Sequence, residues 1–220
     1  MRKFLHLSYT LNEATPVYPG DAPVSVTAVR QMKKGDTCNT SSISISSHAG
    51  THMDAPRHFF KVGKGMGEYD LKKFIFKHPY VIDCPKKPGE AIRPEDIRMS
   101  GRAKKADIVI IRTGFGKYRS KNTAVYCHEN PYLLPMAAER IVKNFPRARA
   151  VGIDTVSVSA KTNSSLGKET HRILLGKGIV IIEDMRLSGA LGNLKEIIVF
   201  PAFTCSPDGS PCAVIGVIHD

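Results

Sequence analysis

The feature that most limits the possible folds is a series of short apolar runs at residues 81–84, 108–112, 150–154 and 179–182. Runs of this length are typical of strands that are buried on both faces. The longest apolar stretches are far below the ~18 residues that a membrane-spanning helix requires. We therefore expect a sheet with a buried centre and no association with a membrane.

Further strands are predicted toward both ends of the chain. Apolar and polar residues alternate at 5–11, 24–28 and 41–47, and strands are also expected at 196–203 and 213–218. The turn-forming residues 207–211 would join the last two as a hairpin. Helices are expected at 134–145 and 169–175, with Gly176 and Gly178 ending the second. This distribution favours a mixed α/β (α+β) domain over a doubly wound parallel one.

Composition narrows the class of protein. The 220 residues, 42% of them hydrophobic, suit a single domain over residues 1–220 with an ordinary packed core. The net charge of +12 comes from scattered basic doublets with no nucleic-acid-binding motif, which predicts a solvated surface and no nucleic-acid partner. Weak attraction of anionic substrates is the remaining interpretation.

The cysteines and the beginning of the chain indicate the compartment. Five cysteines without a C-x-x-C pair are typical of free thiols under reducing conditions. Residues 1–21 alternate in polarity and contain no apolar core of a signal peptide. We therefore expect a cytoplasmic protein.

One segment carries most of the chemistry, residues 46–59, which read S-S-H-A-G-T-H-M-D-A-P-R-H-F. Imidazole and carboxylate are ligands that suit zinc, manganese and iron. A helical turn would place His48 and His52 on one face, with Asp54 completing the ligand set and one position left open for water. Thr51 is expected to make a supporting hydrogen bond. The alternative is that the histidines are surface or core residues that bind nothing.

Other classes of site are disfavoured by the motifs that the sequence lacks. It has neither a G-x-G-x-x-G after a strand nor a P-loop, so a nucleotide cofactor is not indicated. Ser46 and Ser47 are not part of a G-x-S-x-G elbow, which argues against a serine hydrolase.

The string H-A-G-T-H-M-D-A-P-R-H-F resembles the H-x-G-T-H-x-D-x-P-x-H-F signature of the cyclase family, which includes kynurenine formamidase and isatin hydrolase. The resemblance extends along nearly the whole chain. It includes the segments P-V-Y-P-G-D at 16–21, R-T-G at 112–114, G-I-D-T at 152–155 and S-P-D-G-S-P at 206–211.

The resemblance implies a swivelling β/β/α domain, assembled as a homodimer or a larger oligomer, that binds one or two divalent ions, zinc or manganese. His48, His52 and Asp54 match the ligands of a first ion. Asp54 would also reach a second ion, bound by His171 and Glu183. From the residues alone, His171 and Glu183 would be read as a helix-surface histidine and a solvated acid at a strand end.

His58 matches the residue that performs general acid/base chemistry, although ligand chemistry alone leaves a third imidazole on the same ion as an alternative. The substrate expected is a small molecule, with Tyr18, Phe59 and Phe60 as candidate contacts. The sequence departs from the family where Val156 replaces a proline and Ser159 stands near an expected aspartate, and it has no tryptophan.

The expected reaction is hydrolysis of an amide, formamide or lactam C–N bond by metal-activated water. Two alternatives remain open at this stage. One is a metal-binding protein without catalysis, which the retention of His58 argues against. The other is a metal-dependent lyase or isomerase that uses the same ligands.

Overall fold

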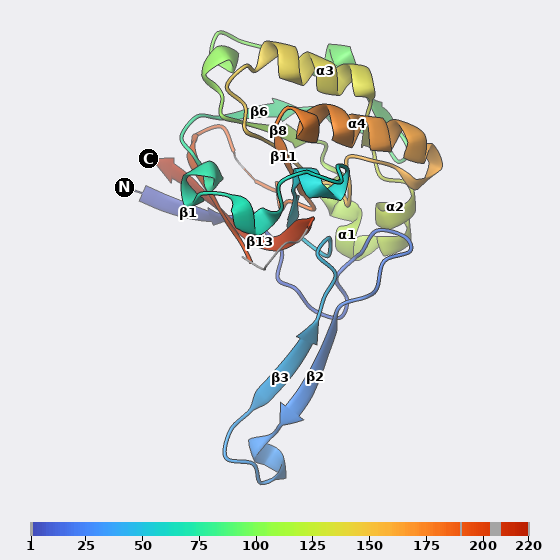
Figure 1. Ribbon diagram of the computed structural model, residues 1–220, viewed down its shortest axis with the longest axis vertical. Helices are drawn as coiled ribbons and strands as arrows, with labels where there is room; N and C mark the ends of the chain where they lie inside the picture. Colours follow the sequence, from blue (N-terminus) through green and yellow to red (C-terminus); the bar gives the residue numbers. More distant parts are fainter. Residues whose placement is uncertain (1, 190, 203–207, 220) are drawn as a thin grey trace.

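The computed structural model describes residues 2–189, 191–202 and 208–219. Over these residues nine strands form one sheet, with β1 paired to β13 beside the main order β5-β12-β13-β4-β11-β10-β8-β6 (Figure 1). These strands are β1 (Arg2–His6), β4 (His52–Asp54), β5 (Ile75–Phe76), β6 (Pro79–Asp83), β8 (Ile108–Arg112), β10 (Ala150–Ile153), β11 (Val180–Glu183), β12 (Leu194–Pro201) and β13 (Gly209–His219).

The sheet is mixed and nearly closes on itself. Strands β6, β8, β10 and β11 are parallel to one another, whereas the pairs that involve β4, β13, β12, β5 and β1 are antiparallel. The two ends of the order, β5 and β6, are joined in sequence by Lys77 and His78 alone. The sheet must therefore curve until its ends meet, which confirms the expected mixed α/β class and gives it a barrel-like shape.

Two apolar cores lie on the two faces of this sheet. Along β8, Ile108 and Ile110 belong to the core enclosed by the sheet, whereas Val109 and Ile111 face the helices. Because strand side chains alternate between faces, the same division continues along β10 and β11. This double burial explains why the central runs are almost wholly apolar.

The two longer helices cover the outer core. Helices α3 (Pro135–Asn144) and α4 (Ser164–Gly176) pack together over one side of the sheet, as Figure 1 shows. Proline at the first turn suits the start of α3, because its missing N–H would be unsatisfied there in any case. The helix buries Ala137, Ala138 and Ile141, which confirms the prediction at 134–145.

Short elements complete the described chain. The helices α1 (Tyr118–Lys121) and α2 (Thr123–His128) follow β8, and β7 (Ala91–Ile92) pairs with β9 (Tyr132–Leu133). Single 3₁₀ turns lie in the connections: η1 (Met32–Lys34), η2 (Pro56–His58), η3 (Met66–Glu68), η4 (Leu71–Phe74), η5 (Pro94–Asp96), η6 (Ala103–Lys105), η7 (Phe115–Lys117) and η8 (Lys161–Asn163).

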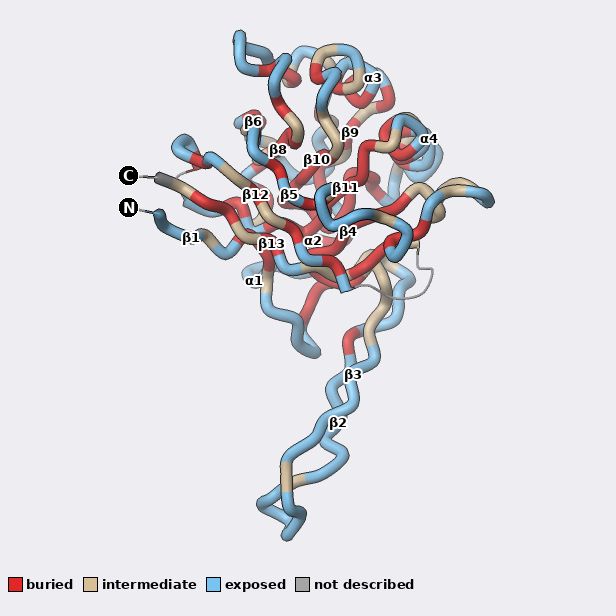
Figure 2. Tube along the Cα trace, turned by 60° about the vertical axis from the view of Figure 1, so that its left-hand side comes forward, coloured by how far each residue is buried: buried red, intermediate tan, exposed pale blue. Residues whose placement is uncertain are grey.

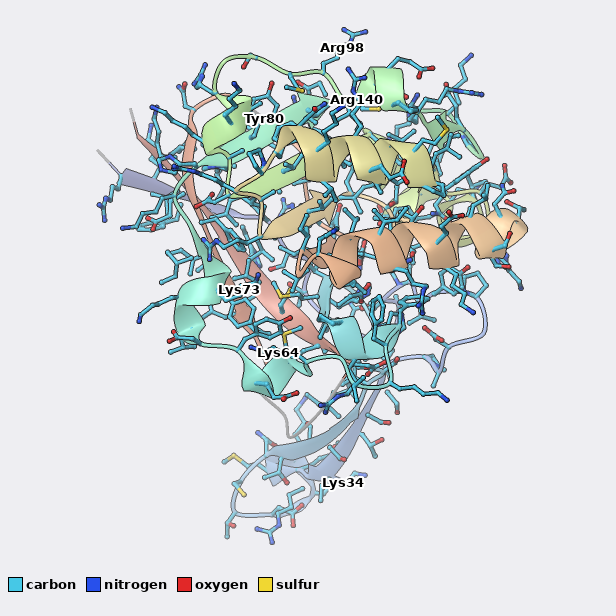
Figure 3. All side chains as sticks on the ribbon, turned by 45° about the horizontal axis from the view of Figure 1, so that its top comes forward. Lys34, Lys64, Lys73, Tyr80, Arg98 and Arg140 are labelled. Atoms are coloured by element: carbon cyan, nitrogen blue, oxygen red, sulfur yellow. The ribbon has the colours of Figure 1, made fainter. Side chains whose placement is uncertain are left out.

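A two-stranded arm projects from the body (Figures 1 and 2). Its strands β2 (Ser25–Arg30) and β3 (Thr40–Ser44) are antiparallel and exposed along their whole length. Lys34 lies at the far end of the arm, where Figure 3 labels it. The sequence predicts both strands. The structure shows that they form a two-stranded sheet of their own, separate from the main sheet.

Several predicted boundaries and one predicted element differ from the structure. The strand expected at 5–11 ends at His6, and the strand expected at 41–47 ends at Ser44. Helix α4 begins at Ser164, earlier than expected. The helical turn expected for His48 to His52 is wrong, because His52 begins strand β4.

The antiparallel pairing of β12 and β13 confirms that these two strands are adjacent. The turn predicted at 207–211 is displaced, because Gly209, Ser210 and Pro211 already belong to β13, and residue 207 lies outside the described part of the chain. The four cysteines that the structure describes are free thiols, and Cys205 lies outside the described residues. Within the described ranges, no helix combines the length and apolar character needed to cross a membrane.

Gly63 lies against the backbone of η2, the turn that carries His58. A Cβ atom at Gly63 would lie 2.5 Å from the carbonyl carbon of Pro56 and 2.6 Å from the nitrogen of Arg57. We expect Gly63→Ala to lower the free energy of unfolding by about 1–3 kcal/mol, because backbone atoms cannot move aside as a flexible side chain can. Urea unfolding measures this loss.

The matched control is Gly101→Ala, because the space around Gly101 is open. A loss of stability at position 101 equal to that at position 63 would contradict the packing argument.

Candidate metal centre

The centre is built on strand β4, which lies between β11 and β13. His52 is directly opposite Glu183 of β11, and Asp54 lies two residues further along β4. Residues two apart on a strand point to the same face, and opposite residues on paired strands are neighbours. His52, Asp54 and Glu183 therefore converge because of strand geometry, and not because of a helical turn. Met53 between them enters the enclosed core.

Helix α4 adds a fourth side chain to this cluster. His171 Nε2 lies 3.5 Å from Asp54 Oδ2 and 3.4 Å from Glu183 Oε1. His52 Nε2 lies 3.4 Å from Asp54 Oδ1 and 3.3 Å from Glu183 Oε2. All four side chains are buried. The structure thus brings His171 and Glu183 into the same cluster as the signature segment.

The two imidazoles are oriented by backbone carbonyls. His52 Nδ1 lies 2.9 Å from the Gly50 oxygen, and His171 Nδ1 lies 2.7 Å from the Gly167 oxygen. A proton on each Nδ1 donates to its carbonyl and leaves the Nε2 lone pair directed at the carboxylates. This is the arrangement of metal-binding histidines, whose second nitrogen is held by a backbone or carboxylate oxygen.

The donor set fits a divalent cation. Asp54 Oδ2 is buried and makes no hydrogen bond within the described structure, although such atoms are normally satisfied. Two imidazole nitrogens and two carboxylates around this oxygen are ligands that suit zinc or manganese. His52, Asp54, His171 and Glu183 are therefore the residues that could hold an ion.

The electrostatics of the cluster point the same way. Burial acts to lower the pKa of His171, but the nearby carboxylates of Asp54 and Glu183 outweigh it and raise that pKa to about 10. Burial and Asp54 act to raise the pKa of Glu183, but His171 and His52 bring it down to about 2. The two buried carboxylates thus favour positive charge beside them, which is the electrostatic setting of a cation site.

A second group lies on the other side of Asp54. His48 Nδ1 is 2.9 Å from Asp54 Oδ1, and His48 Nε2 is 2.8 Å from Asp208 Oδ2. His58 Nδ1 is 3.2 Å from the same Asp208 oxygen, with its ring centre 4.0 Å from that of His48. His48, Asp54 and His58 could also surround an ion. Asp54 is thus shared, but the structure groups His52 with Glu183 and His171 rather than with His48.

Several side chains that support the cluster were not assigned from the sequence. Ser157 Oγ donates to Glu183 Oε1 at 3.0 Å, and the Val158 N–H donates to the same oxygen at 2.7 Å. Asp208 lies in the G-x-D-G-x-P-like turn, which was the signal that could have identified it. Thr51, expected to make a supporting hydrogen bond, donates to the Asp184 carbonyl at 2.6 Å.

Asp184, next to Glu183, adopts a positive φ of 50°. A bidentate ion pair with Arg119 and a hydrogen bond from Tyr126 hold it there. The sequence contains no pattern that would have linked Arg119 to this position.

The motifs R-T-G at 112–114 and G-I-D-T at 152–155 meet beside the centre. Asp154 accepts hydrogen bonds from the Thr113 N–H at 2.8 Å, the Thr113 hydroxyl at 2.6 Å and the Gly114 N–H at 2.9 Å. Asp154 therefore fastens the loop after β8 to the end of β10. These motifs position the strands and contribute no side chain to the metal cluster.

A cavity of about 290 Å³ opens onto the cluster. Tyr18 and Phe59 line it, and Phe59 stacks on His171 with ring centres 4.6 Å apart. Val156 and Ser159, where the sequence departs from the family pattern, also line it. Phe60 does not: it packs against Gly176 and Arg172 outside this cavity.

Comparison with known proteins agrees with this geometry. Kynurenine formamidase of Geobacillus thermodenitrificans is 30% identical over 213 residues, covering 96% of this chain and 95% of the relative. Isatin hydrolase A of Labrenzia aggregata has the same fold, with a TM-score of 0.82 at 23% identity, covering 100% of this chain and 94% of that one. A predicted metal-dependent hydrolase of Bacillus stearothermophilus gives a TM-score of 0.73 at 21% identity, with coverage of 99% and 98%.

The Cyclase family model matches residues 5–160, which include the signature segment and the strands β4, β8 and β10. This match spans well over half of the chain, and the relatedness to kynurenine formamidase extends through His171 and Glu183 to the last strand. The chain therefore belongs to the cyclase family.

Proposed function

We propose that this protein is a metal-dependent hydrolase that cleaves an amide, formamide or lactam C–N bond of a small molecule. The observation that carries the proposal is the buried cluster of His52, Asp54, His171 and Glu183, with the unsatisfied Asp54 Oδ2 at its centre. The relationship to kynurenine formamidase, whose name describes hydrolysis of a formamide, supports the class of bond.

A divalent ion held by this cluster would polarise the substrate carbonyl and lower the pKa of water. His58 contributes the proton chemistry. Its ring lies at the cavity, and burial together with the nearby His48 and His171 lowers its pKa despite Asp54 and Asp208. A neutral imidazole accepts a proton and then donates it to the leaving nitrogen, which is too basic to depart unprotonated.

Asp208 and Phe59 position this group. Asp208 accepts a hydrogen bond from His58 Nδ1, so that the other nitrogen carries the lone pair. Phe59 packs edge-on against the His58 ring at 4.4 Å and flat against His171. The His58 imidazole is therefore held between the Phe59 ring and the Asp208 carboxylate.

The cavity sets the size and polarity of the substrate. About 290 Å³ accommodates a small molecule, with the apolar surfaces of Phe59 and Val156 beside the hydroxyls of Tyr18 and Ser159. An aryl or alkyl amide with one additional polar group matches this lining. We further propose that residues 1–220 act as one domain of the family's swivelling β/β/α type.

The first prediction concerns the metal. Prolonged chelation should abolish hydrolysis of an aryl formamide, and Zn²⁺ or Mn²⁺ should restore it. Glu183→Gln should weaken metal affinity by more than roughly tenfold. Mutation of a residue that only hydrogen-bonds to a metal ligand already lowers affinity by about that factor, and loss of a ligand should lower it further. Metal content is measured by elemental analysis, with the exposed Glu129→Gln as matched control. Full activity in metal-free protein would refute the proposal.

The second prediction concerns His58. As a proton shuttle, His58→Ala should retain the metal and the fold but lose roughly 10²–10⁴ in kcat. The control is His128→Ala, at an exposed histidine in α2, which should leave kcat unchanged. Loss of metal from His58→Ala, with partial rescue by excess metal, would instead make His58 a ligand.

We also propose that the chain assembles as a homodimer or a larger oligomer through the β2–β3 arm. Val26 and Ile43 are directly opposite each other on the arm and are 40% and 63% exposed. An isolated two-stranded hairpin is marginally stable in water. Burial of this apolar pair against a second copy would stabilise the arm.

The double variant Val26→Ser/Ile43→Ser should shift the mass measured by light scattering from the oligomer toward the monomer, because it removes the apolar contact. Thr27→Ala, on the opposite face of the arm, is the control and should not change the mass. A wild-type protein that is monomeric at high micromolar concentration would contradict the proposal.

A further inference from the structure

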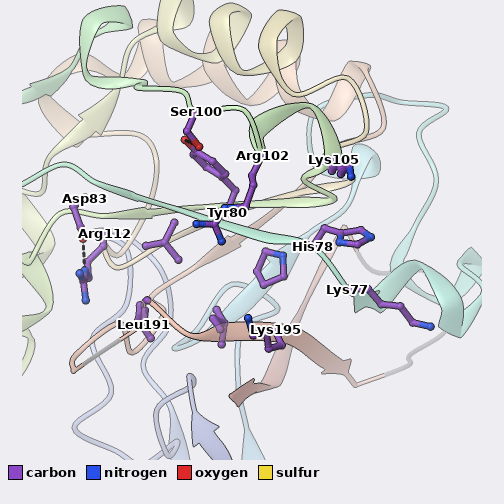
Figure 4. A pocket seen from close by; sticks show the side chains of 14 residues that line it. Lys77, His78, Tyr80, Asp83, Ser100, Arg102, Lys105, Arg112, Leu191 and Lys195 are labelled. Atoms are coloured by element: carbon purple, nitrogen blue, oxygen red, sulfur yellow. Dashed lines mark hydrogen bonds and ion pairs between the residues drawn. The ribbon is translucent and has the colours of Figure 1, made fainter. Parts of the chain in front are cut away.

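A second cavity lies outside the sheet, at the seam between its two ends (Figure 4). It has a volume of about 420 Å³ and is lined by β6, by the segment before β8 and by the residues that enter β12. None of the residues that line it belongs to the metal cluster or to the cavity beside that cluster. We call it the seam groove.

The location explains why a hollow exists. Strands β5 and β6 stand at opposite ends of the hydrogen-bonded order, so β6 and β12 are not joined by backbone hydrogen bonds. Lys77 and His78, which link β5 to β6, stand at one end of the hollow. A sheet that closed completely would leave no space at this point.

Positive charge gathers around the seam groove. Four cationic side chains from three segments line it, and no ion pair joins any of them to a carboxylate in the part of the chain that the structure describes: Lys77, Arg102, Lys105 and Lys195. The one acidic residue in the lining is Asp83, which Arg112 already neutralises. Such a concave arrangement of like charges concentrates anions.

The floor of the seam groove is apolar and carries hydroxyl groups. Leu191 and Leu194 are buried beneath it, and the Tyr80 hydroxyl lies 3.3 Å from Ser100 Oγ. Figure 4 shows Tyr80 and Ser100 close together on one side of the hollow, with Leu191 and Lys195 on the other. An occupant must therefore combine a body that packs on apolar surface with a group of high negative charge.

We propose that the seam groove binds a phosphorylated small molecule with an apolar or aromatic body, at a site separate from the metal centre. A carboxylate would neutralise only one of the four cations, whereas a phosphoryl or diphosphoryl group brings two or more charges and several acceptor oxygens. Lysines bind phosphate as point charges, and Arg102 adds a planar pair of donors. The volume falls within the range usual for small-molecule sites.

Calorimetric titration of the full chain with adenosine diphosphate tests this. The double variant Arg102→Gln/Lys105→Gln should weaken binding by roughly tenfold or more, because it removes two charge-assisted contacts. Glu183→Gln should bind the probe as wild type does, since the seam groove does not involve the metal ligands. The result is thus independent of the proposed hydrolase activity.

The matched control is Lys143→Gln/Lys177→Gln, which removes the same charge from a different surface hollow beside α3 and α4. It should change the affinity less than twofold. If both double variants weaken binding equally, the attraction is a general effect of net charge and the proposal fails. It also fails if the wild-type protein shows no saturable binding of adenosine diphosphate. Phenyl phosphate and benzoate share an aromatic ring and differ in their anionic group, so equal affinity for these two probes would likewise contradict the proposal. Should the double variant unfold, Lys195→Gln alone provides the same comparison.

Discussion

The pairing of buried Asp54 with three imidazoles is the interaction on which the rest of the structure depends. Its carboxylate lies 2.9 Å from His48 Nδ1, 3.4 Å from His52 Nε2 and 3.5 Å from His171 Nε2. Burial acts to raise the pKa of Asp54, yet its contacts with these histidines keep that pKa well below its usual value. A buried carboxylate is costly unless it is paired in this way. The turn before β4, the strand itself and helix α4 must therefore all be in place together.

The two cores make this precision possible. Val180 and Ile182 pack inside the sheet while Ile181 packs under the helices, so β11 is held on both faces just before Glu183. Helix α4 packs on the outer core and places His171 Nε2 3.4 Å from Glu183 Oε1. Groups held by packed elements lose little freedom when a ligand binds, which favours a preorganised centre over one built on loops.

The ends of the sheet have the opposite character. Strand β4 is hydrogen-bonded on both sides, and its polar side chains contact one another. Where β6 and β12 do not pair, Lys77, Arg102, Lys105 and Lys195 line a hollow and form no ion pair within the described residues. One sheet thus produces a buried centre of carboxylates and imidazoles in its middle and a basic hollow at its seam. The difference follows from where backbone pairing is complete.

The sequence by itself determined the strands with strong apolar runs, helix α3, the mixed sheet and the segment that supplies His52 and Asp54 to the buried cluster. These follow from local periodicity and from a long signature, and neither depends on distant contacts. It could not determine that His52 and Asp54 share a strand face. The spacing of two between His52 and Asp54 suits a strand, whereas the spacing of four between His48 and His52 suits a helix, so both structures were compatible with that segment. It also could not assign Asp208, Arg119 or the position of Phe60. Only the tertiary structure decided these, since the pairing of β4 with β11 and β13 joins residues that are more than a hundred positions apart in the chain. The grouping of His52 with Glu183 and His171, and the open seam between β6 and β12, arise from that pairing and leave no trace in local sequence.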